Sequence, residues 1–300
     1  MIANLQILFD APALGLQLVI DGILIGAVFA LAAYGMALVW GVTNIVNVCQ
    51  GEFVMLGGFV TVLLAEQGMP PLLAAPVAAG VLYALGFILF QAVIVHLIGR
   101  DLFISLLATF GIAIVLQQLV ARGFGADDRI VESGLGSWFM FDGLVGISKV
   151  KVLVFAACVL LGAALTAFLS RSRQGQAIRA TAQEPRAASV LGIDTRQVYR
   201  LAYALNAAIC GAAGALAVMA YTIHPYGGLS YTIRSFMIVV VAGIGNLFGI
   251  VWAAFGLGIA ESFAGFIFGP QYQIAFVFAL LVVVLVLRNW RLKAQRRYLE

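Results

Sequence analysis

Residues 171–200, RSRQGQAIRATAQEPRAASVLGIDTRQVYR, are the longest strongly basic interruption between the apolar runs of this chain, with six arginines against two acidic residues. An arginine-rich loop between apolar segments is typical of the cytoplasmic face of a membrane protein. Pro185 suits the first turn of a helix, and Gly192 suits the left-handed residue just past a helix end. The segment therefore predicts a membrane domain with a cytoplasmic loop that contains a short helix.

Two interpretations of this loop remain open at this point. The arginines alone are explained by the preference of basic loops for the cytoplasm. The short helix adds two adjacent alanines, Ala187 and Ala188, followed by Ser189 and the terminal Gly192. These small residues predict a smooth surface that another protein could bind.

The composition excludes a water-soluble globular protein. Of the 300 residues, 63% are hydrophobic and 10% are charged, and the mean hydropathy is +1.08. Soluble domains carry about 25% charged residues. The net charge of +4 lies mostly in two basic segments, so we expect no nucleic-acid partner. The three cysteines, Cys49, Cys158 and Cys210, lie in apolar runs, and their odd number argues against structural disulfides.

The apolar runs predict an all-α polytopic membrane protein in one domain, 1–300. A run of about 20 residues crosses the hydrocarbon core, so 232–266 is too long for one crossing. Gly243-Ile244-Gly245-Asn246 interrupts it and predicts two crossings. Together with the remaining runs this gives about eight to ten transmembrane helices, some of them broken or short. The remaining runs are 14–40, 53–66, 72–97, 102–121, 150–170, 199–221 and 271–287.

Charge places the basic loop and the basic tail at 288–297 in the cytoplasm and the N-terminus outside. In this topology Arg234 lies at the outer border, and Glu261 lies at the membrane interface near the end of an apolar run. The segment 41–52 has an alternative, because it could re-enter the membrane instead of joining two crossings.

Three stretches bring polar or glycine residues close to apolar spans, at 40–58, 106–112 and 242–249. Polar side chains and non-helical backbone at membrane depth are tolerated only against protein or a wet cavity. Glycines between two half-helices can also leave backbone groups pointing into the membrane, as at transport sites. The stretches supply the candidates for a translocation pathway: Asn44, Asn47, Gln50, Glu52, Thr109, Gly111, Gly243, Gly245 and Asn246.

Ordinary structural roles compete with a pathway role for several of these residues. Asn44 could cap a helix, and Glu52 could lie at the interface. Thr109 could bond back to its own helix, and Gly111 could allow a close helix crossing.

Sequence motifs for catalysis are missing. The chain has no G-x-x-x-x-G-K-[ST], no H-E-x-x-H and no G-x-S-x-G. These motifs bind nucleotide phosphates, hold zinc and present a nucleophilic serine. We therefore expect no enzyme activity, no catalytic residue and no metal site in this chain.

Several motifs resemble one family. Positions 186–192 resemble the x-A-A-x-x-x-G of the EAA loop in ABC-importer permeases, with Arg186 where the motif has Glu. The stretch 44–58 resembles the signature I-N-F-A-H-G-E-F-V-M-L-G, with matches at Asn47 and 51–57 and departures at 48–50. Further likeness lies in L-A-T-x-G at 107–111, G-I-G-[SN] at 243–246 and I-x-E at 259–261. Together, from about 22 to 287, they resemble the branched-chain (hydrophobic) amino-acid ABC-transporter permeases, in particular the shorter permease subunit type.

The resemblance implies the ABC importer permease fold and a place in the bacterial inner membrane. A second, related permease would form the pathway with this chain. Two ATPase subunits would bind the cytoplasmic loops, and a periplasmic binding protein would deliver the solute. ATP and magnesium would belong to the ATPases, so this chain would hold no cofactor. Within a coupling loop at 176–193, the residues that would contact an ATPase are Arg179, Glu184, Pro185, Arg186, Ala187, Ala188 and Gly192.

The implied solutes are branched-chain or other hydrophobic amino acids, or the urea, short amides and aromatic acids carried by relatives in this family. Gln50, where the signature has His, leaves this choice open. Two other classes of protein remain as alternatives. One is a stand-alone secondary transporter or channel for a small polar solute, and the other is an integral-membrane enzyme. A self-contained carrier would not need the loop at 176–193.

Overall fold

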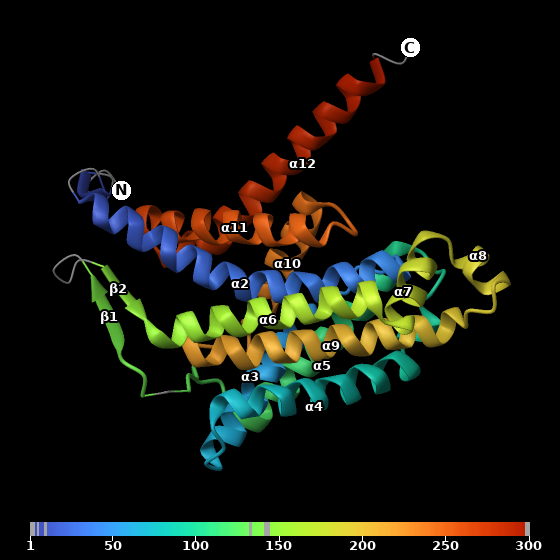
Figure 1. The fold of residues 1–300 in the computed structure, drawn as a ribbon, viewed down its shortest axis with the longest axis horizontal. Coiled ribbons are helices and arrows are strands. Elements are labelled where there is room, and N and C mark those ends of the chain that lie inside the picture. Colours follow the sequence, from blue (N-terminus) through green and yellow to red (C-terminus); the bar gives the residue numbers. More distant parts are fainter. Residues whose placement is uncertain (1–3, 5, 9–10, 132–133, 141–144, 298–300) are drawn as a thin grey trace.

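The structure is a computed structural model, and it describes residues 4, 6–8, 11–131, 134–140 and 145–297. Helices dominate it, and one two-stranded antiparallel hairpin joins α5 to α6 (Figure 1). The elements are α2 (Pro12–Thr43), α3 (Gln50–Glu66), α4 (Pro71–Ala92), η1 (Ile94–His96), α5 (Leu102–Phe124), β1 (Ser137–Met140), β2 (Val145–Ser148), α6 (Lys149–Arg171), α7 (Arg173–Gln183), α8 (Pro185–Val190), α9 (Thr195–Ala220), α10 (Gly228–Ala242), α11 (Leu247–Phe268), η2 (Pro270–Tyr272) and α12 (Gln273–Arg297).

The candidate membrane spans agree in position with the apolar runs of the sequence. In the described part of the chain, seven helices are long and apolar enough to cross a membrane, and α10 is a shorter apolar helix. The predicted break at 243–246 is confirmed, since α10 ends at Ala242 and α11 begins at Leu247. Gly243 and Gly245 have φ angles of +85° and +88°. L-residues with a side chain rarely adopt these angles, so the two glycines end one helix and allow the next to begin.

Helices α2 and α9 form the centre of the bundle. In their most apolar 18-residue windows, 89% and 78% of residues are buried inside the chain, against 28% for α4, α5 and α6. Helix α2 begins beside the β-hairpin and ends beside α7, so it runs the length of the molecule (Figure 1). The peripheral helices therefore turn long apolar faces outward, toward lipid or another subunit.

Small residues bring α3 against the middle of α9. A Cβ added to Gly57 would come 2.5 Å from the Cα of Gly211, and one added to Gly214 would come 2.9 Å from the nitrogen of Gly58. Helices in membranes approach this closely only where both carry small residues. The packing therefore fixes α3 at one height along α9.

Helix α3 begins inside the bundle. The Gln50 side chain donates a hydrogen bond to the carbonyl of Ala32, which lies eleven residues before the end of α2 at Thr43. Eleven helical residues span about 16 Å. The segment 44–49 therefore turns back along α2 before α3 starts, and the structure favours re-entry over a simple connection between two crossings.

Helix α10 begins at the same depth. Its first residue, Gly228, lies against Gly51 and Glu52 in the first turn of α3. The chain leaves α9 at Ala220, passes through 221–227 and starts α10 beside α3. The N-termini of two half-helices thus meet inside the bundle, away from both of its ends.

Candidate functional site

The segment 176–193, which the resemblance identifies as a candidate coupling segment, has the local geometry that its sequence predicts. Pro185 occupies the first turn of α8, and the Glu184 side chain caps that turn by accepting a hydrogen bond from the Arg186 N–H at 3.4 Å. Gly192 follows the helix end with a φ of +87°. The Ile193 N–H closes the end by donating to the Ala188 carbonyl at 3.0 Å. This is the left-handed ending expected of a C-terminal glycine.

The surface of α8 differs from the predicted one. Ala188 is buried, with 3% of its surface exposed, so the two alanines do not form a shared outer face. Val190 and Leu191 are instead 87% and 81% exposed. We call these two residues the α8 tip. Sequence reasoning missed them because the motif emphasised the two alanines and Gly192, whereas Val190 and Leu191 occupy its variable positions.

Helix α7 connects the α8 tip to the transmembrane helices. A Cβ on Gly175 would come 2.5 Å from the Cα of Leu169 in α6, so the two helices touch through their backbones. Arg179 donates a hydrogen bond to the Ser170 carbonyl at 3.2 Å. Ile178 is 2% exposed and packs in the core with residues of α2 and α9. Arg179 thus holds α7 onto α6.

The 243–246 turn lies at the same end of the molecule. Gly245 and Asn246 line a depression of about 280 Å³ together with Arg179. Asn246 caps α11, because its side-chain oxygen accepts a hydrogen bond from the Gly249 N–H at 2.9 Å. Gly243 precedes this turn as the C-cap of α10. The structure therefore brings Gly245 and Asn246 next to Arg179 of α7, and it places Gly243 at the C-terminus of α10, away from the N-termini of the half-helices.

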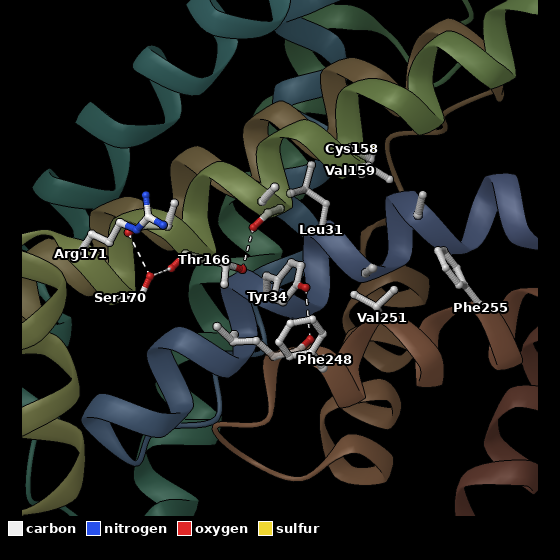
Figure 2. A pocket seen from close by; sticks show the side chains of 16 residues that line it. Leu31, Tyr34, Cys158, Val159, Thr166, Ser170, Arg171, Phe248, Val251 and Phe255 are labelled. Atoms are coloured by element: carbon white, nitrogen blue, oxygen red, sulfur yellow. Dashed lines mark hydrogen bonds between the residues drawn. The ribbon is translucent and has the colours of Figure 1, made fainter.

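A larger depression of about 520 Å³ lies beside this turn, between α2, α6 and α11 (Figure 2). The Tyr34 hydroxyl donates a hydrogen bond to the Leu247 carbonyl at 3.1 Å across its floor. Apart from Arg171 at one end, its lining carries no charged side chain. An apolar wall of this kind does not suit a charged solute.

A separate group of candidate residues lies where the two half-helices meet. We call it the half-helix junction and define it as residues 47–52 with Gly228 and Thr232. Its side chains are buried although several are polar. Gln50 is fully buried, and its amide nitrogen contacts both the Ala32 carbonyl and the Cys210 sulfur at 2.8 Å. Asn47 accepts a hydrogen bond from the Cys49 thiol at 2.9 Å.

Two threonines support the non-helical backbone of the half-helix junction. Val48 donates its N–H to the Thr109 hydroxyl at 3.2 Å and accepts from the Thr232 hydroxyl at 2.9 Å. Thr232 also accepts from the Gly51 N–H at 2.8 Å. Backbone groups away from water need such partners. Thr109 bonds back to its own helix as well, through the Ser105 carbonyl at 2.9 Å.

Glu52 lies between the N-termini of the two half-helices. It belongs to the first turn of α3, and its carboxylate lies against Gly228 at the start of α10. A helix N-terminus carries partial positive charge. One carboxylate therefore offsets two helix dipoles inside the bundle, which explains a buried acid better than the interfacial role considered for it.

Several polar atoms of the half-helix junction have no hydrogen-bond partner among the described residues. They include the Asn47 amide nitrogen, one oxygen each of Gln50 and Glu52, and the amide nitrogen of Asn206 on α9. Buried polar atoms without partners cost free energy unless water or a ligand satisfies them. The junction thus has spare hydrogen-bonding capacity at one depth in the bundle.

Two pathway candidates lie elsewhere. Asn44 is exposed and ends α2 in a left-handed conformation, with a φ of +54°. Gly111 lies on the exposed face of α5, where an added Cβ would meet no atom within 4 Å. The half-helix junction therefore contains Asn47, Gln50, Glu52 and its partner Thr109, but neither of these two.

Arg234 and Glu261, which the sequence analysis placed separately at the outer border and at the interface, are partners of each other in the structure. The two side chains form a buried ion pair between α10 and α11, with exposed fractions of 12% and 5%. Sequence reasoning treated each charge alone, near the edge of an apolar run. The available signal was that opposite charges inside neighbouring apolar runs must find each other in lipid. Within the described parts of the chain, no group of three or more His, Cys, Asp or Glu side chains is placed to hold a metal ion.

The described residues form a helical bundle with seven candidate spans, two half-helices that meet inside it and a structured basic loop, and this architecture is that of a multi-pass membrane permease. The family model described as the permease component of branched-chain amino acid transport systems matches residues 18–285. The chain therefore belongs to this family.

Curated relatives are similar over nearly their whole length. The high-affinity branched-chain amino acid transport system permease protein BraD of Pseudomonas aeruginosa is 32% identical over 288 residues, covering 91% of this chain and 94% of BraD. LivH of Escherichia coli, which carries the same description, is 30% identical over 90% of this chain and 92% of LivH.

A solved structure has a similar fold. A chain in the complex of PsaBC from Streptococcus pneumoniae with Fab matches with a TM-score of 0.50 and 12% sequence identity, over 95% of each chain.

Proposed function

We propose that this chain is the permease subunit of an ATP-driven importer in the bacterial inner membrane, acting as one transmembrane domain. A second, related permease completes the pathway, two separate ATPase subunits bind the segment 176–193, and a periplasmic protein delivers the solute. The solutes are branched-chain or other hydrophobic amino acids, as the similarity to BraD and LivH suggests. ATP and magnesium belong to the ATPase subunits.

The observation that carries the proposal is the α8 tip. Val190 and Leu191 stand out from a loop that is otherwise rich in arginine and polar residues. Burying an aliphatic side chain of this size stabilises a complex by about 1.5–3 kcal/mol. An isolated carrier gains nothing from two exposed aliphatic residues in its basic loop. In a partner with an apolar cleft and an acidic rim, the cleft would bind the α8 tip. The acidic rim would pair with the surrounding arginines and so fix the orientation of the complex.

The contacts of α7 support a route for coupling. Gly175 and Arg179 hold α7 against α6, and Arg179 shares a depression with the turn before α11. A displacement of α8 by closing ATPases would therefore move α6, α7 and this turn together. In the proposal, Gly243, Gly245 and Asn246 transmit this motion to α10, whose first residue belongs to the half-helix junction.

The half-helix junction is the proposed inner part of the pathway. Its candidates are Asn47, Gln50 and Glu52, which are buried and retain unmatched polar atoms, and Thr109, whose hydroxyl bonds to the Val48 N–H. Replacing Gln50 with His or Ala should change uptake or solute preference by several-fold and assembly much less. Identical kinetics for every tested solute would remove Gln50 from the pathway.

The test of the function is uptake by proteoliposomes that contain the whole importer. We expect uptake of L-leucine to require ATP and to be lost when 184–192 is replaced by a Gly/Ser linker. A matched control replaces the exposed residues 125–128, which follow α5, with a Gly/Ser linker of equal length. Uptake by this chain alone in ATP-free liposomes would show a self-contained carrier instead.

A further inference from the structure

The Arg234–Glu261 ion pair has the geometry of a strong charged hydrogen-bond network. The Arg234 Nε donates to both Glu261 oxygens, at 2.9 and 3.1 Å, and a second guanidinium nitrogen donates to Glu261 Oε1. The guanidinium carbon also lies 5.1 Å from the ring centroid of Phe29 and 5.8 Å from that of Tyr231. Two aromatic rings and a carboxylate thus orient one planar cation.

Stability alone does not explain this pair. Removing two charges from water costs several kcal/mol per ion, and a well-packed apolar pair often serves a fold equally well. Ionisable side chains that face the interior of a membrane domain usually mark the route of a solute or an ion. The pair joins α10, one of the two half-helices, to α11.

The ion pair lines a cleft of about 260 Å³ between α2, α10 and α11. A water molecule occupies about 30 Å³ of liquid volume, so a cleft of this size has room for several waters or one small solute. Ser230 of α10, Ser262 of α11 and Tyr221, which follows α9, also line this cleft. The Tyr221 hydroxyl is buried and has no hydrogen-bond partner among the described residues.

The cleft opens at the end of the bundle opposite α8. Tyr221 and Thr222 follow directly after the last residue of α9, whereas α8 precedes the first. A helix of 26 residues, such as α9, spans about 39 Å. Thr222 is exposed at this end. A solute delivered from outside would therefore meet the cleft before it reaches the half-helix junction.

A zwitterionic amino acid is the solute whose charges match this cleft. Its carboxylate can replace Glu261 on the guanidinium fork, and its ammonium group can take the freed Glu261 carboxylate. An anion alone would leave Glu261 unmatched, and a cation alone would leave Arg234 unmatched, which is costly in a buried site. Urea and simple amides carry no charge to exchange with the pair. The rings of Phe29 and Tyr231 offer an apolar wall to an aliphatic side chain.

We infer that this cleft is an entry site for zwitterionic amino acids, in which Arg234 binds the solute carboxylate and Glu261 binds its ammonium group. The inference rests on the proposed function and narrows its solute class. It assigns recognition to the permease itself, before the solute reaches the half-helix junction.

The test is protection of an introduced cysteine in the intact importer, without ATP. Ser262→Cys and, separately, Ser230→Cys place a thiol in the lining of the cleft, and the native cysteines are buried. L-Leucine should slow labelling by a charged methanethiosulfonate reagent. The probes 4-methylpentanoate and 3-methylbutylamine, which keep only one of the two charges, should not.

Arg234→Gln and Glu261→Gln should each raise the half-protecting concentration of L-leucine at least about 30-fold, as expected when one partner of a buried charged contact is removed. The matched control is Asp21→Asn. Asp21 pairs with Lys151 at 2.7 Å, but with side-chain exposures of 30% and 27%, and it lies outside this cleft. Protection in the Asp21→Asn variant should be unchanged.

The outcomes separate the inference from the proposed function. An importer that takes up L-leucine with ATP but shows no protection at either cysteine contradicts the inference alone. Protection without ATP-dependent uptake contradicts the proposed function alone. Equal protection by 4-methylpentanoate or by urea also overturns the inference, because neither compound carries both charges.

Discussion

The α8 tip and the half-helix junction depart from the usual distribution of residues in opposite ways. The tip exposes Val190 and Leu191 in a loop that faces water, whereas the junction buries Gln50 and Glu52 in a bundle surrounded by apolar residues. Each departure costs free energy in the isolated chain. The comparison indicates that the α8 tip is suited to bind a protein partner, whereas the half-helix junction is suited to bind a polar solute or water.

The contacts that hold the α8 tip and the half-helix junction in place also differ. The α8 tip depends on contacts within a few residues, such as the Glu184 cap and the left-handed Gly192. The half-helix junction depends on Thr109 and Thr232, which lie 61 and 184 residues from Val48. Substitutions of the close-packed glycines and supporting threonines of the junction should therefore damage the fold, and substitutions at the tip should damage only coupling.

The largest effect is expected at Gly51. A Cβ there would come 2.6 Å from the carbonyl carbon of Gly228 and 2.8 Å from the Thr232 hydroxyl, so Gly51→Val should cost about 3 kcal/mol or more by overpacking. Size-exclusion chromatography and thermal unfolding in detergent should show loss of the folded species. The matched control is Gly80→Ala in α4, where an added Cβ meets nothing within 4 Å. Equal stability of Gly51→Val and wild type would contradict the meeting of the half-helices.

The next effect concerns the α8 tip. The double substitution of Asp for Val190 and Leu191 should lower ATP-dependent uptake more than tenfold, because charges in an apolar contact cost several kcal/mol. Thermal unfolding of the purified chain should stay unchanged, since both side chains are exposed. Val190→Leu with Leu191→Met keeps the tip apolar and should retain uptake. Equal loss of uptake in both double variants would point to a change of fold and not to a lost partner contact.

A smaller effect is expected at the end of α8. Gly192→Val should cost about 1–2 kcal/mol, because a β-branched residue disfavours a φ of +87°. The strain should distort α8 and reduce the solute imported per ATP hydrolysed by about tenfold, while the chain still inserts. Gly192→Asn should come close to wild type, since Asn tolerates the left-handed region. Unchanged uptake by Gly192→Val would remove this helix end from coupling.

The smallest effects should come from the two threonines that hold Val48. Thr232→Val and Thr109→Val should each lower stability by about 1–3 kcal/mol, because each leaves a backbone group of the re-entrant segment unpaired. Thr232→Val should cost more, since its hydroxyl serves both Val48 and Gly51. The control is Thr61→Val, whose hydroxyl bonds only within its own helix, to Gly57. Chemical denaturation of the three variants under the same conditions gives the free energy of unfolding of each. Equal values for all three would contradict the expected order.

The sequence predicted those features that depend on local backbone rules. The glycines at 243 and 245 revealed the break between α10 and α11, and Pro185 with Gly192 revealed both ends of α8. Hydropathy gave the spans because about 20 apolar residues suffice to cross the hydrocarbon core. The sequence alone could not predict features that depend on contacts between residues far apart in the chain.

The depth at which α3 and α10 begin is one such feature. Nothing within 44–49 indicates that Thr109 and Thr232 will support its backbone. The Arg234–Glu261 pair is another, because a hydropathy window averages over charges that only the packing of α10 on α11 brings together. The outward position of Val190 and Leu191 also depends on packing, since α8 turns Ala188 inward.

The most direct measurement of the central claim is co-purification of the tagged full-length chain from its own membrane in mild detergent, with mass spectrometry of the proteins that accompany it. The account predicts an ATPase subunit and a second permease with the wild-type chain. The Asp double substitution at Val190 and Leu191 should lose the ATPase and keep the permease. Recovery of this chain without an ATPase, or retention of the ATPase by the double variant, would contradict the account.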